Sequence, residues 1–219
     1  MEQSEKTNEV VARILEAGFT LFRRYGFRAI TMDEIAAQTG MSKKTLYAHF
    51  TDKDDLVTTV IRERLKAIQE MCVHYQEKSK DAVEELLLMM QYLNSLFRNM
   101  NAIVLHDMKK HHPAAYQLFR DHMQGFVLNS IRTNLKRGIE EGLYRAEVDI
   151  EVICRIRLDA CMVGFRPEVF PGDEFEMSRV QEVSVLHYLF GVATIKGHKL
   201  ILKYREKMMN NEQIKRHSA

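Results

Sequence analysis

Residues 31–56, TMDEIAAQTGMSKKTLYAHFTDKDDL, carry the strongest local structural signals of the chain. The first four residues spell a capping box, in which the Thr31 hydroxyl accepts from a backbone amide of the new helix while the Glu34 carboxylate reaches back. This helix should end at Gly40, because glycine favours the left-handed conformation found at helix C-termini. Ser42 is the next N-cap candidate. The stretch therefore predicts two short helices joined by a tight turn.

Two short helices joined by a turn that contains glycine are typical of a helix-turn-helix. The second helix, expected to run to about Phe50, has a polar outer side that includes Lys43, Lys44, Thr45, Tyr47 and Ala48. Its N-terminal half is short enough to enter a DNA major groove, which is roughly 12 Å wide. Six basic and three acidic residues in 23–53 favour this interpretation, although a solvated helical hairpin would show the same spacing. The expected core of this part is Phe19, Phe22, Ile35, Leu46, Phe50 and Leu56.

The same stretch closely resembles the TetR-like (tetracycline-repressor-like) transcriptional regulators. The resemblance is specific over residues 8–60, and beyond them it rests on chain length and an all-helical remainder. It implies a dimer with an N-terminal three-helix DNA-binding domain and a larger helical domain for effector binding and dimerisation. We accordingly expect a DNA-binding domain at 1–52, a ligand-binding and dimerisation domain at 53–209 and a frayed polar tail at 210–219.

Eight residues match positions at which the family contacts DNA. Four match positions that meet the groove: Ser42, Lys43, Lys44 and Thr45. The other four match positions at the phosphate backbone: Tyr47, His49, Lys53 and Thr31. The sequence departs from the common pattern at Lys44, where glycine is frequent, and at Ala48, where an aromatic or polar residue is frequent. Lys44 can add a base or phosphate contact, whereas no contact is expected from Ala48.

The rest of the chain predicts further helices, because apolar residues recur with helical periodicity almost everywhere and alternating patterns are absent. We therefore expect an all-α protein. Thr51 is the expected N-cap of a long helix that reaches about residue 78 and links the two domains. The other expected helices cover residues 8–24, about 86–97, 101–110, 113–142, 149–165, 175–193 and 197–208, with a surface loop at 166–174.

Methionine and aromatic residues accumulate in the second half of the chain. Adaptable thioethers and rings suit a pocket for an apolar or aromatic small molecule, and the resemblance implies such a pocket here. Ordinary core packing is the alternative for each residue taken singly. The candidate ligand-binding residues are Met89, Met90, Leu93, Phe97, Tyr116, Phe119, Met123 and Phe126.

The helix at 175–193 is apolar on two faces. One face is expected to pack on its own domain, and the other on a second copy in a two-fold symmetric interface. A central buried helix of a monomer would show the same pattern. The candidate dimer residues are Val183, Leu186, Phe190, Leu200, Ile201 and Tyr204.

Histidines and cysteines do not suggest a metal or redox site. We expect surface positions for His106, His111, His112 and His122, because no Cys or paired carboxylate completes a tetrahedral set. Three scattered cysteines, Cys72, Cys154 and Cys161, are typical of buried thiols in a reducing compartment. We expect no cofactor.

Composition and charge restrict the class of protein further. The chain has 219 residues, 46% of them hydrophobic, so it can bury a core. A net charge of only +2 requires any nucleic acid to bind a local patch. The polar start is no signal peptide, and no apolar run approaches the roughly 18 residues of a membrane span, so we expect a cytoplasmic protein.

These observations favour a ligand-responsive repressor that binds a palindromic double-stranded DNA operator as a homodimer. A constitutive DNA-binding dimer without an effector is one alternative. A helical enzyme is a remote one, since the chain contains no GxxxxGK[ST], HExxH, GxSxG or CxxC motif.

Overall fold

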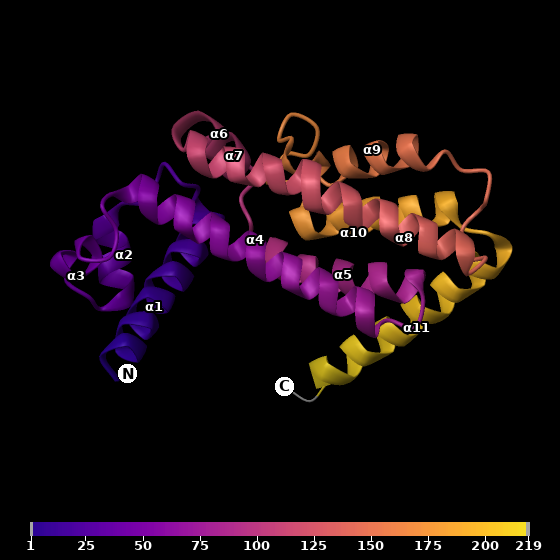
Figure 1. Cartoon of the computed structure of the whole chain (residues 1–219), viewed down its shortest axis with the longest axis horizontal. Helices are drawn as coiled ribbons and strands as arrows, with labels where there is room; N and C mark the ends of the chain where they lie inside the picture. Colours follow the sequence, from indigo (N-terminus) through magenta and orange to yellow (C-terminus); the bar gives the residue numbers. More distant parts are fainter. Residues whose placement is uncertain (1, 218–219) are drawn as a thin grey trace.

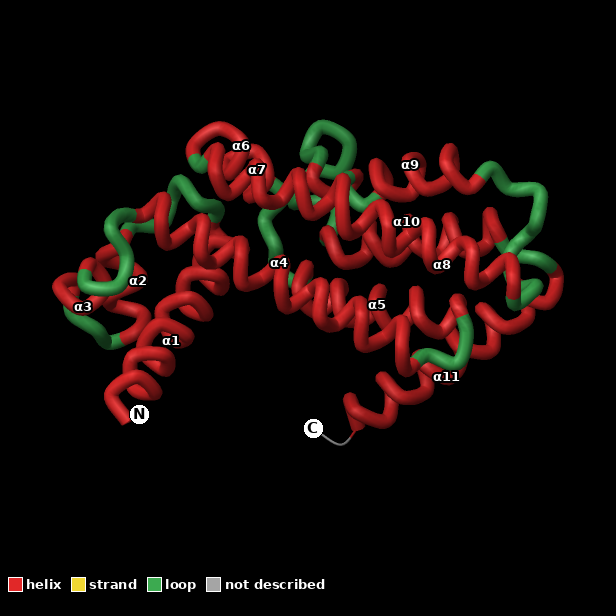
Figure 2. Tube along the Cα trace, viewed as in Figure 1, coloured by secondary structure: helices red, strands yellow, loops and turns green. Residues whose placement is uncertain are grey.

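The computed structural model describes residues 2–217, with the side chains of residues 7–210, and the expected all-α class is confirmed (Figures 1 and 2). The helices are α1 (Glu2–Tyr25), α2 (Met32–Thr39), α3 (Lys43–Tyr47), α4 (Lys53–Lys78), α5 (Ala82–Phe97), α6 (Ile103–His111), α7 (Pro113–His122), a π-helical turn (Met123–Val127), α8 (Leu128–Glu140), α9 (Ile150–Ala160), a 3₁₀ turn (Val163–Phe165), α10 (Met177–Val192) and α11 (Ile195–His217).

The chain is elongated, with a head formed by α1, α2 and α3 at one end and a body of longer helices at the other (Figure 1). Helix α4 runs from the head into the body. The head core contains every residue expected there, and it also includes Val104, Met108 and Ala115 from α6 and α7. A second core fills the body. The proposed division at residues 52 and 53 therefore crosses a continuous packing layer, since Leu56, Val57 and Val60 of α4 belong to the head core.

The local signals around the first turn act as the sequence predicts. The Glu34 amide donates to Thr31 Oγ1 over 3.2 Å, and the Thr31 amide donates to Glu34 Oε2 over 2.7 Å, which completes the capping box. Gly40 ends α2 with φ of 66°, the left-handed conformation expected there, and Gly26 ends α1 in the same conformation with φ of 83°.

The expected N-cap of α4 is wrong by one residue. Asp52 caps the helix, because its Oδ1 accepts from the Asp55 amide over 2.8 Å. The Thr51 amide instead donates to Asp55 Oδ2 over 3.0 Å. Aspartate is the stronger N-cap, and at Asp52 it also places a negative charge at the positive end of the helix.

Several helix limits also differ from expectation. Helix α1 begins at Glu2, and α11 continues to His217, so the tail expected to be frayed is helical through that residue. Both extensions lack proline and glycine, and periodicity alone does not detect a polar helix. The helix expected over 113–142 is divided by the π-helical turn, and α9 ends at Ala160 before the 3₁₀ turn. Each interruption contains one glycine, Gly125 or Gly164, but the periodicity of apolar residues does not mark where a helix is interrupted.

Several polar contacts join the head to the body. The Arg28 amide donates to Asp107 Oδ2 over 3.1 Å, and the Asn101 amide donates to the Arg23 carbonyl over 2.7 Å. His112 Nδ1 lies 2.5 Å from Asp54 Oδ1 at the first turn of α4. His112 is buried, so its expected surface position is wrong. Its ring fills the junction between α6, α7 and the head, and packs edge-on against Phe27.

Candidate nucleic-acid interface and internal cavity

Helix α3 lies at the tip of the head, away from the body (Figure 1). It is anchored from behind by Leu46 and Phe50, which are 0% and 4% exposed. The helix ends at Tyr47 rather than near Phe50, yet the Phe50 amide still donates to the Leu46 carbonyl over 3.0 Å. Arg13 of α1 donates to the carbonyl of Thr39 over 2.9 Å and holds the end of α2. The short helix is therefore fixed in direction by its buried side.

The outer side of α3 presents most of the predicted DNA-contacting residues together. Lys43, Lys44 and Tyr47 are exposed, and Thr45 and His49 are partly exposed. Ser42 is also exposed, but its Oγ accepts from the Thr45 amide over 3.1 Å as the N-cap. Groups that can bind phosphate or base edges thus lie on one surface, as a groove-binding helix requires.

Lys43 already has a partner on α2. Its Nζ lies 2.6 Å from Asp33 Oδ2, and both side chains are well exposed. The hydrogen bond and charge of Asp33 raise the pKa of Lys43. Exposed ion pairs of this kind stabilise a protein little, so a DNA phosphate can compete for the ammonium group.

The two remaining predicted residues lie at the starts of α2 and α4. The Thr31 hydroxyl donates to Glu34 Oε2 over 2.9 Å, so this side chain serves the capping box. Lys53 is partly buried, and desolvation lowers its pKa against the opposing charges of Asp54, Asp107 and Glu34. Thr31 and Lys53 therefore lie at the N-terminal ends of α2 and α4 rather than on α3.

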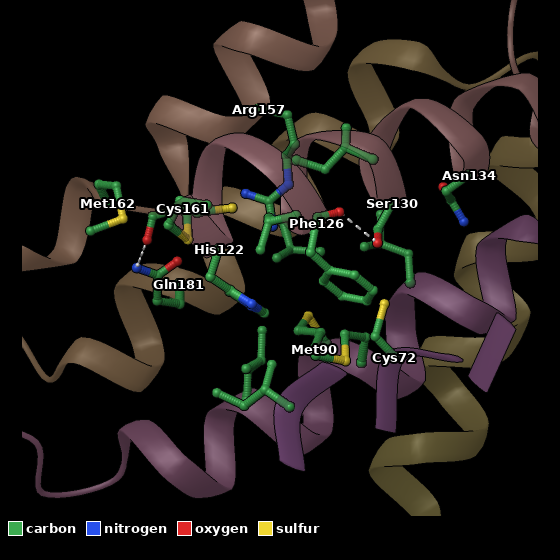
Figure 3. A pocket seen from close by; sticks show the side chains of 18 of the residues that line it. Cys72, Met90, His122, Phe126, Ser130, Asn134, Arg157, Cys161, Met162 and Gln181 are labelled. Carbon is green, nitrogen blue, oxygen red and sulfur yellow. Dashed lines mark hydrogen bonds between the residues drawn. The ribbon is translucent and has the colours of Figure 1, made fainter. Parts of the chain in front are cut away.

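The body encloses a cavity of about 200 Å³ (Figure 3). A single water needs only about 10–15 Å³, so the space admits a larger molecule. Seven of the eight predicted ligand-binding residues line it: Met89, Met90, Leu93, Phe97, Phe119, Met123 and Phe126. Tyr116 does not line the cavity, because its position on α7 packs it against the head core.

Sequence reasoning missed the polar residues of the cavity wall. His122 lies inside rather than at the surface, and its ring stacks on Phe126 with centroids 5.3 Å apart. Burial lowers the pKa of His122. Asn94 and Arg157 also line the cavity. Single polar residues on otherwise mixed helix faces give no periodic signal, so nothing in the sequence distinguished them from surface residues.

The predicted dimer residues divide between two environments. Val183 is 60% exposed, whereas Ile201 is fully buried in the body core. Tyr204 donates its hydroxyl to Asp81 Oδ2 over 2.6 Å, so it serves the fold of its own chain. Leu186, Phe190 and Leu200 pack against the same core. The exposed Ile156 of α9 lines one groove together with Val183, and the exposed Val152 lies one turn before Ile156 on the same helix.

The cysteines are free thiols, of which Cys154 is buried, while Cys72 and Cys161 are partly exposed and line the cavity. Among the residues whose side chains the structure describes, no group of three or more His, Cys, Asp and Glu residues could hold a metal ion. Within the described range, no helix combines the length and apolar character needed to cross a membrane.

A short exposed helix that is anchored on one side and follows a glycine turn is the arrangement of helix-turn-helix DNA-binding proteins. Residues 14–60 match the family described as "Bacterial regulatory proteins, tetR family". The chain belongs to this TetR-like family of transcriptional regulators.

Relatives and solved structures agree with this assignment. The HTH-type transcriptional repressor KstR2 of Mycolicibacterium smegmatis is 23% identical over 192 residues, which cover 85% of this chain and 92% of the relative. The uncharacterized HTH-type transcriptional regulator YvaF of Bacillus subtilis is 32% identical over 105 residues, so the match spans 48% of this chain and about half (55%) of that protein. The fold is similar to that of a TetR-family regulator from Agrobacterium tumefaciens, with a TM-score of 0.68, 15% identity and coverage of 86% and 100% of the two chains. It is also similar to FadR from Bacillus subtilis in complex with stearoyl-CoA, with a TM-score of 0.63, 18% identity and coverage of 83% and 98%.

Proposed function

We propose that this regulator is a repressor that binds a palindromic operator as a homodimer and is released when a small molecule occupies the cavity. The observation that carries the proposal is that the head and the cavity share two helices. Helix α4 contributes Leu56 and Val60 to the head core, and Leu65 and Ile68 to the cavity wall. A change in the cavity can therefore move the head.

Helix α7 supplies a second connection. Ala115 belongs to the head core, while Phe119, one turn further on, lines the cavity. Directly before this helix, His112 contacts Asp54 at the start of α4. A ligand that favours one arrangement of α4 and α7 lowers operator affinity by its differential binding free energy, typically 1–3 kcal/mol.

Two heads are needed to bind successive major grooves, about 34–36 Å apart. We place the dimer contact on the exposed apolar face formed by α9 and α10. This face includes Val152, Ile156 and Val183, and a groove beside it is lined by Phe170 and Phe175. It replaces the interface expected from the sequence, of which Val183 alone remains on the face.

Proteins of similar fold support the proposal that this chain binds an effector. One alternative function remains open. FadR was solved with stearoyl-CoA, and a regulator from Saccharomonospora viridis was solved with choline, so this fold accommodates ligands in other proteins. A constitutive DNA-binding dimer would bind the same operator but would not respond to any cavity ligand. The relatives are regulators rather than enzymes, and a regulator of this kind acts on DNA in the cytoplasm.

Selection of bound sites from random double-stranded DNA tests the proposal. A palindromic consensus is expected, because a two-fold symmetric dimer presents two equal heads. In a mobility-shift assay with that site, Lys43→Ala and Tyr47→Ala should weaken binding, each by roughly tenfold or more, without changing the dimer. Lys66→Ala is the matched control, since Lys66 is an exposed lysine on α4 beyond the head.

Two outcomes would contradict the assignment. A non-palindromic or absent consensus would remove the operator and its symmetry. Unchanged affinity in both head variants would remove α3 as the surface that binds DNA.

A further inference from the structure

Arg157 is a buried cation in the wall of a mostly apolar cavity. It is only 5% exposed, and its Nη1 has no hydrogen-bond partner. The guanidinium lies 5.5 Å from the centroid of the Tyr188 ring. An aromatic face compensates a buried charge only in part, and burying an unpaired charge is costly.

No carboxylate neutralises Arg157 within the part of the chain whose side chains are described. The acidic residue of the cavity wall, Glu85, lies 3.0 Å from Arg137, which also pairs with Glu141. Asp159, two residues after Arg157 on α9, pairs with Arg166. The carboxylate of the cavity wall and the carboxylate nearest to Arg157 in sequence are thus already engaged.

The other titratable groups of the cavity wall do not supply a negative charge. Burial lowers the pKa of His122, which favours its neutral form. Burial raises the pKa of Cys72 and of Tyr188, which keeps both protonated. The remaining titratable groups of the wall are Tyr75 and Cys161. The cavity therefore carries one uncompensated positive charge.

Two further polar atoms face the same space without partners. They are Nε2 of His122, at the end of α7, and Oδ1 of Asn94, on α5. Figure 3 shows Arg157 and His122 entering the cavity from different helices. Most of the remaining wall is methionine, leucine and aromatic carbon. The cavity thus combines one cationic point and two polar points with a long apolar surface.

We propose that the effector is a small amphipathic monocarboxylate, whose carboxylate pairs with Arg157 and whose hydrocarbon body packs on the methionine and phenylalanine side chains. A carboxylate matches the planar guanidinium and balances its single charge. A phosphate monoester would bring more negative charge than one arginine balances. His122 and Asn94 are then available to a second polar group, such as a hydroxyl or carbonyl. This inference rests on the proposed effector-binding function.

Calorimetric titration with matched probes tests the charge requirement. The probes are straight-chain carboxylates of six to twelve carbons, the primary alcohols of equal length, and octyl phosphate. The tightest carboxylate should bind the wild-type protein at least tenfold more tightly than the alcohol of equal length, and more tightly than octyl phosphate. In Arg157→Met, which keeps an apolar side chain of similar length, this preference for the carboxylate should disappear while the alcohol still binds. Arg155→Met is the control, because Arg155 is an exposed arginine on the same helix.

The wild-type comparison of acid with alcohol needs no variant, so it stands even if Arg157→Met folds poorly. Equal binding of the acid and the alcohol, failure of every acid to bind, tighter binding of octyl phosphate, or a preference that survives Arg157→Met would each overturn the proposal. The titration contains no DNA, so loss of operator binding, which would overturn the proposed function, is measured separately.

Discussion

Gly26 offers a quantitative test of how the head is joined to the body. It ends α1 with φ of 83°, and a Cβ built there would lie 2.7 Å from Asp107 Oδ2 and 3.2 Å from Ile103 Cγ2. Asp107 is 5% exposed and accepts from the Arg28 amide over 3.1 Å. Gly26→Ala should therefore strain the backbone and also push this carboxylate away from its donor.

The cost of the backbone strain and the cost of the displaced carboxylate can be estimated separately. A left-handed conformation costs a non-glycine residue about 1–2 kcal/mol. Disrupting a hydrogen bond at a buried polar group costs a further 1–3 kcal/mol or so. The free energy of unfolding should therefore fall by about 2–5 kcal/mol in Gly26→Ala. Gly142→Ala is the matched control, because Gly142 has φ of 67° and no atom within 4 Å of the added Cβ. It should show the backbone cost alone.

Urea unfolding followed by circular dichroism measures both variants, with the midpoint compared at constant slope. Equal losses in Gly26→Ala and Gly142→Ala would refute the reasoning, because the contact with Asp107 would then contribute nothing. A loss in Gly26→Ala that is undiminished in an Asp107→Ala background would do the same, since only the backbone cost should remain once the obstructing carboxylate is gone.

Two further expectations concern pH and assembly. Because burial lowers the pKa of His122 below its ordinary value of 6.5, the folded protein binds fewer protons than the unfolded chain, so stability is full above pH 6.5 and falls as the pH drops below it. His122→Gln should reduce this slope, to which one group contributes at most about 1.4 kcal/mol per pH unit. Burial also lowers the pKa of His112, so the contribution of His112 should remain. A slope that His122→Gln leaves unchanged, as the exposed His106→Gln control should, would contradict this expectation. Val183→Glu should turn dimer into monomer in sedimentation experiments, because it places a charge on the proposed interface, while Val73→Glu on α4 should not; a dimer that persists in Val183→Glu would exclude the α9–α10 face.

The head could be predicted closely because its signals are local. Thr31, Gly40 and Ser42 act on amides within a few residues, and the spacing of Leu46 and Phe50 alone decides which side of α3 is buried. The one-residue error at Asp52 arose where two adjacent residues could both cap a helix. These signals do not depend on how distant segments pack.

The body could be predicted only in outline, because its function depends on contacts between distant helices. Periodicity correctly identified an apolar side of α11, but not that Ile201 would be covered by its own chain. The same limit placed His122 at the surface and overlooked Arg157. A polar side chain on a helix reads alike in sequence whether it faces water or an internal space, and only the packed neighbours decide.

On the proposed DNA-binding surface, the ion pair between Lys43 and Asp33 competes with the binding of DNA phosphates. Contact with a phosphate is an exchange of one anion for another, and the abandoned carboxylate is then left near the negatively charged backbone. The charge of Asp33 thereby cancels part of the attraction between Lys43 and the DNA backbone, whatever the DNA sequence. A regulator must find one site among roughly 10⁶–10⁹ competing non-specific sites. Weaker non-specific binding therefore shortens the time that the protein spends at the wrong sites.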